Sequence, residues 1–179
     1  MSRKQPSEPS SDAGGDVAPR RDSIEWSRRR WADAGEPEPD HFAAMAAVMR
    51  LHQVVGAELD RALREHDLTR TAYLILCTLR IAGDHTLPMG QLSRRLMLHP
   101  TTISLVADKL EKRALVTRAP HPTDRRTVLA TLTGEGVAAL ADANRTLAQA
   151  GYGLPEVSDR LAITLTEVVR EVRERIGDR

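Results

Sequence analysis

Two adjacent arginines in a short polar turn are the residues of this chain whose type and spacing best fit a binding chemistry. Arg125 and Arg126 follow Pro122 and Asp124, and proline and aspartate are typical turn residues. A guanidinium pair at the tip of a turn has no use in a core, but it suits phosphate groups and narrow minor grooves. The segment therefore predicts a cationic turn that contacts a nucleic-acid backbone.

Short hydroxyl residues precede the turn, at the expected start of a helix. Thr101, Thr102 and Ser104 follow Pro100. Their hydroxyl groups can reach phosphates or base edges, and a helix N-terminus itself favours a phosphate. The alternative is that Thr101 and Thr102 only cap the helix, and capping is compatible with contact.

Positive charge is concentrated in the segment that holds these residues. The 179-residue chain has a formal net charge of +1. Residues 89–126 hold 8 Lys/Arg against 3 Asp/Glu, a net charge of +5, whereas residues 1–88 and 127–179 each carry a net charge of −2. This asymmetry is typical of a nucleic-acid-binding module, although an ordinary solvated cationic face fits the charge alone equally well.

The composition argues against an enzyme, a metal protein and a membrane protein. The six histidines are scattered without metal-ligand spacing, and the single cysteine excludes a cysteine-rich zinc site. No glycine loop for phosphate and no nucleophile motif is present. The longest uncharged apolar run, residues 42–49, is too short to cross a bilayer. We expect a soluble, cytoplasmic, non-enzymatic protein without a cofactor.

Apolar periodicity predicts a mainly α-helical chain. Residues 1–21 are polar and rich in Pro, Ser and Gly, which predicts a disordered tail. Two short strands are expected within residues 115–133, around the arginine turn. Helices are expected at residues 22–34, 41–65, 69–82, 89–98, 101–113, 137–150 and from after 155 to 176. The order helix, helix, short break, helix, hairpin corresponds to a winged helix-turn-helix.

This order and several motifs resemble the MarR family of bacterial transcription regulators, from about residue 41 to the C-terminus. Within residues 105–136, Leu-Glu-Lys ends the expected recognition helix, Asp-x-Arg lies in the wing, and Leu-Thr-x-x-Gly ends its second strand. Ala114 departs from the family, where Gly is common. The resemblance implies one domain, residues 22–179, with a winged-helix lobe at 67–136 and dimerisation helices at 22–66 and 137–179.

The resemblance also implies a homodimeric repressor that binds a pseudo-palindromic operator in double-stranded DNA. An apolar stripe on the last helix, from Leu161 to Ile176, supports a dimer; its alternative is burial against the subunit's own first helix. The Asp-x-Arg motif implies that Asp124 orients one arginine through a bidentate pair. The predicted DNA-contacting residues are Pro100, Thr101, Thr102, Ser104, Lys109, Arg113, Arg118, Asp124, Arg125 and Arg126.

Many family members release DNA when a small aromatic or phenolic ligand binds between the dimer region and the DNA-binding lobe. The residues expected to line such a cleft are Met49, His52, Tyr73 and Cys77, although residues of this kind are more often core or interface. Trp31 is a further candidate, because it resembles a ligand-contacting tryptophan on the extra N-terminal helix of a urate-responsive branch of the family. In that branch, an acidic residue and an arginine stand where Leu74 and Val106 lie here, so urate is not the expected signal.

Two other functions fit parts of the sequence. A thiol-based redox regulator would sense through Cys77, but this cysteine lies in the apolar segment AYLILCTL, and burial raises the pKa of a thiol and makes it inert. A helical interaction module that does not bind DNA would lack the salt-dependent duplex affinity of a repressor.

Overall fold

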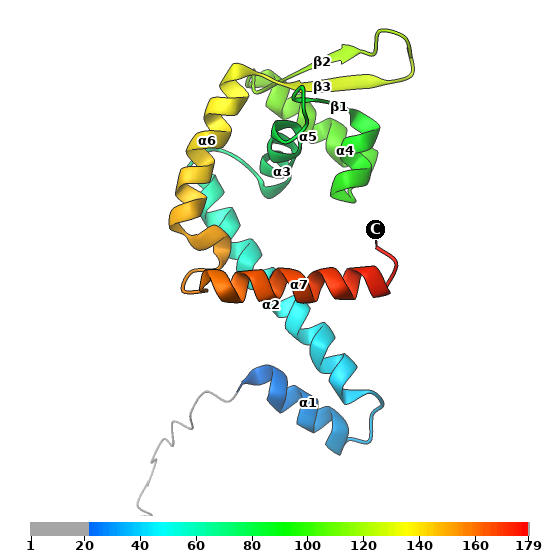
Figure 1. The fold of residues 1–179 in the computed structure, drawn as a ribbon, viewed down its shortest axis with the longest axis vertical. Coiled ribbons are helices and arrows are strands. Elements are labelled where there is room, and N and C mark those ends of the chain that lie inside the picture. The colour runs from blue at the N-terminus through cyan, green and yellow to red at the C-terminus, as the bar shows by residue number, and fades with distance from the viewer. Residues whose placement is uncertain (1–21, 179) are drawn as a thin grey trace, which may run out of the picture. The chain divides into compact units, whose positions relative to one another are not determined.

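The structure is a computed structural model that describes residues 22–178 (Figure 1). The predicted disordered tail, residues 1–21, lies outside this range. The described residues fall into two compact units, 22–50 and 51–178, and helix α2 (Pro39–Arg64) contributes to both. Within residues 22–178, no helix combines the length and the hydropathy needed to cross a membrane.

In the first unit, helix α1 (Ser23–Asp33) is connected to the start of α2 by a short turn that one aromatic pair closes. Asp22 caps α1 by accepting a hydrogen bond from the backbone N–H of Ile24, as expected for a helix at residues 22–34. The rings of Trp31 and Phe42 stack with their centroids 4.1 Å apart, and the indole N–H of Trp31 donates to the carbonyl of Pro37 at 2.8 Å. The turn between α1 and α2 is therefore held by its own side chains.

The second unit contains the winged helix-turn-helix. Its elements after α2 are α3 (Arg70–Arg80), β1 (Thr86–Pro88), α4 (Met89–Leu96), α5 (Pro100–Lys112), β2 (Val116–Pro120), β3 (Val128–Leu132), α6 (Gly134–Gln149), the short 3-10 helix η1 (Gly151–Gly153) and α7 (Asp159–Arg175). The helices predicted from periodicity are confirmed to within a few residues. Helix α6 begins three residues before the predicted Val137 because Thr133 caps it, accepting from the N–H of Gly136.

The three strands form one antiparallel sheet in the order β1-β3-β2. Hairpin β2–β3 is the predicted wing, and β1 is an element that the sequence analysis missed because three residues ending in proline carry no readable alternation. Val128, Ala130 and Leu132 alternate along β3, and Ala130 and Leu132 are buried whereas Val128 is 42% exposed. The hairpin extends beyond the core at that end.

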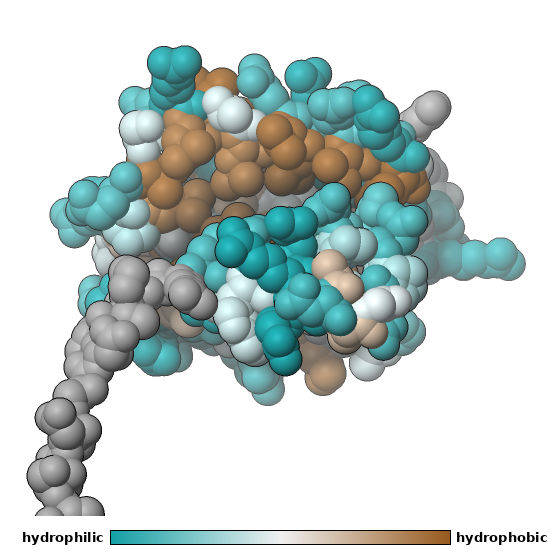
Figure 2. Space-filling view, turned by 90° about the horizontal axis from the view of Figure 1, so that it is seen from below, coloured by the Kyte–Doolittle hydropathy of each residue, from teal (hydrophilic) through white to brown (hydrophobic). Residues whose placement is uncertain are grey.

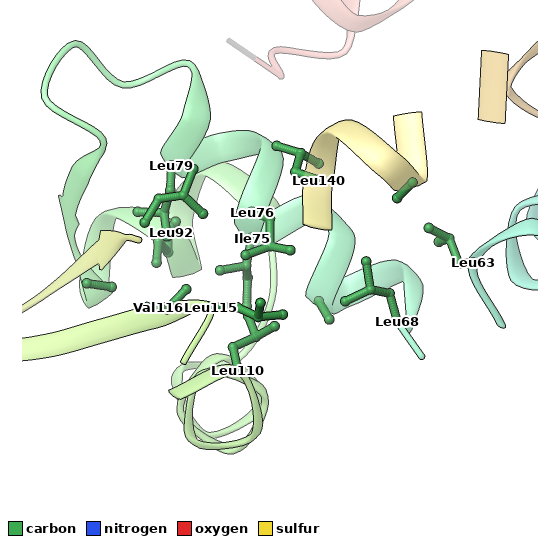
Figure 3. Close-up of a cluster of buried hydrophobic side chains, with 14 of the residues drawn as sticks. Leu63, Leu68, Ile75, Leu76, Leu79, Leu92, Leu110, Leu115, Val116 and Leu140 are labelled. Atoms are coloured by element: carbon green, nitrogen blue, oxygen red, sulfur yellow. The ribbon is translucent and has the colours of Figure 1, made fainter. Parts of the chain in front are cut away.

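Helix α3 lies at the centre of the hydrophobic core, as its apolar sequence predicts (Figure 3). Ile75, Leu76 and Leu79 are fully buried, although Leu74 on the opposite side is 45% exposed. The side chains that surround them come from α2, α4, α5, the wing and α6, and they include Leu63, Leu92, Ile103, Leu110, Val116 and Leu140. A helix buried by neighbours on several sides positions all of them relative to one another.

Gly136 offers a test of this packing, because a side chain at this position has no room. A Cβ on Gly136 would overlap the backbone carbonyl of Leu115 and come within 2.7 Å of Leu132 Cδ1. We expect Gly136→Ala to lower the free energy of unfolding by about 1–3 kcal/mol, as overpacking does in other cores. Chemical denaturation followed by circular dichroism measures this loss.

Gly134→Ala is the matched control, since a Cβ at Gly134 meets no atom within 4 Å in the same first turn of α6. We expect this variant to be as stable as the wild type or slightly more stable, because alanine favours a helix over glycine. Equal unfolding midpoints for the two variants would contradict the packing described for Gly136.

Candidate nucleic-acid interface

Helix α5 buries one face and exposes the other. Ile103, Ala107 and Leu110 pack into the core, and Val106 is partly buried beside them. The turn before α5 is tight, with Met97 in the left-handed region and the hydroxyl of Ser93 donating to the carbonyl of Leu98 at 2.6 Å. The exposed face carries Pro100, Thr101, Thr102, Ser104, Leu105 and Lys109.

The N-terminus of α5 is capped by His99, which is not one of the usual capping residues. The ring of His99 accepts a hydrogen bond from the backbone N–H of Thr101 at 3.2 Å, and Pro100 occupies the first helical position. The alternative that Thr101 and Thr102 serve as caps is therefore wrong. Their exposed hydroxyl groups stand in the first turn of the helix, where they are available for other contacts.

The wing tip is a turn organised by the carboxylate of Asp124. This carboxylate accepts from the hydroxyl of Thr127 at 2.7 Å and from the backbone N–H of Arg126 at 3.0 Å. Both hydrogen bonds lower the pKa of Asp124, and the bond from Thr127 has the larger effect. The backbone N–H of His121 closes the turn by donating to the carbonyl of Thr127.

The role predicted for Asp124, a bidentate pair with one arginine, is wrong. Asp124 forms no ion pair with Arg125 or Arg126, all three of which lie in the described part of the chain. The carboxylate holds the backbone of the turn instead, because a short side chain reaches an N–H two residues on more easily than a guanidinium at the tip. Both arginines remain exposed to solvent.

Arg118 on β2 connects the wing to α5. Its guanidinium lies 2.6 Å from Glu111 Oε2 and 2.6 Å from Asp108 Oδ1. The backbone N–H of Arg118 donates to the other oxygen of Glu111 at 3.0 Å. The side-chain hydrogen bond from Arg118 lowers the pKa of Glu111. These contacts are intramolecular, and the DNA contact expected of Arg118 stays a prediction.

Arg113, at the C-terminal end of α5, is also engaged with the protein's own atoms. Its guanidinium donates to the backbone carbonyls of His66 and Asp67 in the loop between α2 and α3. The ring of His66 in turn hydrogen bonds with the hydroxyl of Thr146 on α6 at 2.8 Å. The C-terminal end of α5 is thus tied to α2 and α6, and DNA contact by Arg113 stays a prediction.

One open cavity brings the helix-turn-helix and the wing together. It has a volume of about 550 Å³, and its lining includes Arg94, Ser104, Arg118, Asp124 and Arg126. Four of these residues, Ser104, Arg118, Asp124 and Arg126, belong to the predicted DNA-contacting set. Arg94 of α4 was missed, although its place in the +5 segment was the signal that could have found it. Cationic groups from α4, β2 and the wing tip thereby share one surface.

The five predicted ligand-binding residues are divided between the two units. None of them belongs to the lining of the cavity beside the wing or of a shallow hollow along α7. Trp31 and Met49 belong to the first unit, where Trp31 stacks on Phe42 and Met49 is exposed. In the second unit, His52 is exposed and the hydroxyl of Tyr73 donates to Asn144 at 2.8 Å. Ligand binding by these residues stays a prediction.

Cys77 is half-buried on α3 and packs against the core. Burial raises the pKa of its thiol, which keeps the unreactive protonated form at neutral pH. The surroundings favour a structural cysteine. Among residues 22–178, no group of three or more His, Cys, Asp or Glu side chains is placed to hold a metal ion.

Within the second unit, residues 51–178, the apolar stripe of α7 is not covered by other elements. Leu161, Val168, Val172 and Ile176 are each more than half exposed, and α7 has no buried residue. Burial of this stripe against the subunit's own first helix, the alternative considered from sequence, is not tested, because residues 22–50 form a separate unit. The space-filling view shows exposed apolar residues gathered into a band (Figure 2). An exposed band of this kind is typical of an interaction surface.

Comparison with known proteins places this fold in a family. The MarR family model matches residues 68–128. YhbI of Bacillus subtilis, named as an uncharacterized HTH-type transcriptional regulator, is 30% identical over 128 residues, which are 67% of this chain and 82% of YhbI. The HTH-type transcriptional regulator MhqR of the same organism is 31% identical over 93 residues, 52% of this chain and 63% of MhqR.

Solved structures agree. The MarR family regulator Sco5413 of Streptomyces coelicolor superposes with a TM-score of 0.71 at 29% identity, covering 78% of this chain and 96% of Sco5413. Sco3205 of the same organism, solved in complex with DNA, has the same fold with a TM-score of 0.66 at 23% identity. The match covers 73% of this chain and 84% of Sco3205. The chain belongs to the MarR family of transcription regulators and is a DNA-binding protein.

Proposed function

We propose that the chain is a homodimeric repressor that binds a pseudo-palindromic operator through α5 and the wing. The observation that carries this proposal is the single cationic surface on which Ser104 of α5, Arg94 of α4 and Arg126 of the wing meet around one cavity. Two relatives of the same fold, Sco3205 of Streptomyces coelicolor and a MarR mutant of E. coli, were solved in complex with DNA, which supports a duplex as the partner.

In this proposal the two parts of the surface have different tasks. The exposed N-terminal half of α5 enters the major groove, where Thr101, Thr102 and Ser104 offer donors to base edges and phosphates. Arg125 and Arg126 follow the backbone or the adjacent minor groove. Asp124 contributes by holding the turn that presents them.

The wing arginines give the most direct test of DNA binding. We expect Arg125→Ala and Arg126→Ala each to weaken duplex binding by about 1–3 kcal/mol, the range for a well-placed contact. If the contact is to phosphate, the slope of log K against log salt falls by about one. Fluorescence anisotropy titrations on a selected duplex, at several salt concentrations, measure both quantities.

Arg145→Ala is the matched control for that experiment. It removes the same charge from an exposed ion pair with Asp142 on α6 and should leave the duplex affinity close to wild type. A wild-type chain without salt-dependent duplex affinity would overturn the repressor and favour a helical interaction module. Affinity unchanged in both wing variants would remove the wing from the interface.

The contacts of Arg118 lead to a second test, of how the wing is positioned. Glu111→Gln removes a negative charge from the proposed DNA surface, and electrostatics alone would then raise the duplex affinity. We expect the affinity to fall instead, because the tie between α5 and β2 is weakened. Amide hydrogen exchange should become faster in β2, including the N–H of Arg118.

Glu135→Gln, at an exposed site in the first turn of α6, is the control for the loss of one charge. A rise in affinity for Glu111→Gln with unchanged exchange in β2 would contradict a positioning role. It would also favour direct DNA contact by Arg118, as the sequence analysis predicts.

The uncovered stripe of α7 supports the dimer, because a continuous apolar helix face is stable in water only when something covers it. A second copy presents the same stripe, and an isologous contact of this kind matches a twofold operator. We expect light scattering at micromolar concentration to give twice the chain mass of 19.8 kDa.

Val168→Glu should shift the population toward monomer, because it places a charge within the stripe. Arg170→Glu is the control, since residue 170 lies about 200° around the helix from residue 168. A monomeric wild type, or equal dissociation of the two variants, would argue against α7 as the dimer interface.

We also propose that a small aromatic or phenolic ligand releases the protein from its operator. BpsR of Bordetella bronchiseptica, which shares the fold at 22% identity, has its DNA binding regulated by 6-hydroxynicotinic acid, and this supports an aromatic signal. The chain's candidates remain Trp31, Met49, His52, Tyr73 and Cys77. A screen of aromatic acids and phenols against the protein–duplex complex, with anisotropy as the readout, tests for release.

A further inference from the structure

Helix α5 exposes one large apolar side chain on an otherwise polar face. Leu105 is 59% exposed, and its neighbours one turn away on the same face are Thr101 and Lys109. A single exposed leucine is common on protein surfaces and needs no explanation by itself. The position of Leu105, at the middle of the surface proposed to enter the major groove, gives it a chemical context.

The charged groups around Leu105 favour close approach of a duplex. Asp108 and Glu111, the two acids on α5, are both paired with Arg118 of the wing, which reduces their repulsion of phosphate. Lys109 is exposed on the same helix. Along the exposed face of α5, the hydroxyl of Thr101 comes first, then the apolar side chain of Leu105, and then the ammonium group of Lys109.

The major groove offers one apolar group for such a side chain. The bases present donors and acceptors there, and the 5-methyl group of thymine is the exception. A leucine leaves a donor or an acceptor of any other base edge unpaired but packs favourably against a methyl group. We propose that Leu105 is a specificity-determining residue that contacts the methyl group of thymine in each half-site, an inference that rests on the proposed role of α5.

Replacement of thymine by deoxyuridine tests this contact, because it removes the methyl group and keeps the hydrogen-bonding edge. A duplex is first selected with the full-length wild-type protein from a randomised pool, and each thymine is then replaced in turn. We expect at least one position per half-site at which the wild type loses about fourfold in affinity, the value of burying one methyl-sized group. Leu105→Ala should bind the thymine and deoxyuridine duplexes equally at that position.

Ile81→Ala is the matched control. Ile81 is 79% exposed at the C-terminal end of α3, outside α5, and its loss should leave the thymine-to-deoxyuridine ratio at the wild-type value. A second variant, Leu105→Gln, repeats the selection and should change the preferred base at the same position from thymine toward adenine, which glutamine pairs with. Circular dichroism checks that the variants are folded.

The outcomes separate this inference from the function on which it rests. If the wild type binds its selected duplex in a salt-dependent way but no deoxyuridine replacement distinguishes it from Leu105→Ala, the thymine contact is wrong and the repressor stands. An unchanged preference in the Leu105→Gln selection would also overturn the contact. If no duplex is selected at all, both the proposed function and the thymine contact are overturned.

Discussion

The burial of α3 is the constraint on which the rest of the lobe depends. Ile75, Leu76 and Leu79 are fully buried, and they are surrounded by side chains from α2, α4, α5, the wing and α6. Because a close-packed core fixes the orientation of every element that contributes to it, burying Ile103 and Leu110 of α5 against α3 determines that the opposite face of α5 is exposed. The candidate interface is therefore the face of α5 that the core leaves exposed.

The arginines of the cationic segment divide into two groups by what they contact. Arg118 and Arg113 both act at the C-terminal half of α5: Arg118 joins it to β2, and Arg113 joins it to the loop after α2. Arg125 and Arg126 extend from a turn that Asp124 holds through backbone and hydroxyl bonds. Arg113 and Arg118 thus stabilise the fold of the lobe, whereas Arg125 and Arg126 remain exposed to solvent and accessible to a partner. His66 extends these contacts to α6 through its hydrogen bond with Thr146.

Much of the fold could be predicted from sequence, since helices with a period of three to four apolar residues and a hairpin around a polar turn are local patterns. The parts that could not be predicted depend on distant residues. Strand β1 exists because β3 offers it a partner. His99 caps α5 through a ring nitrogen, although histidine is not among the residues that usually cap helices. Val128 is exposed because the wing extends past the core.

The sequence by itself determined the order of the main helices and of the wing hairpin, the location of the positive charge and the resemblance to the family, because all of these depend on local residue types and spacing. Only the tertiary structure decided which charged groups are paired within the protein, that Arg94 joins Ser104 and Arg126 at one cavity, and that Leu105 stands exposed among polar neighbours. The physical reason is that a side chain's partners and exposure depend on residues that the core brings together in space. The separation of those residues along the sequence does not show how close they lie in the fold.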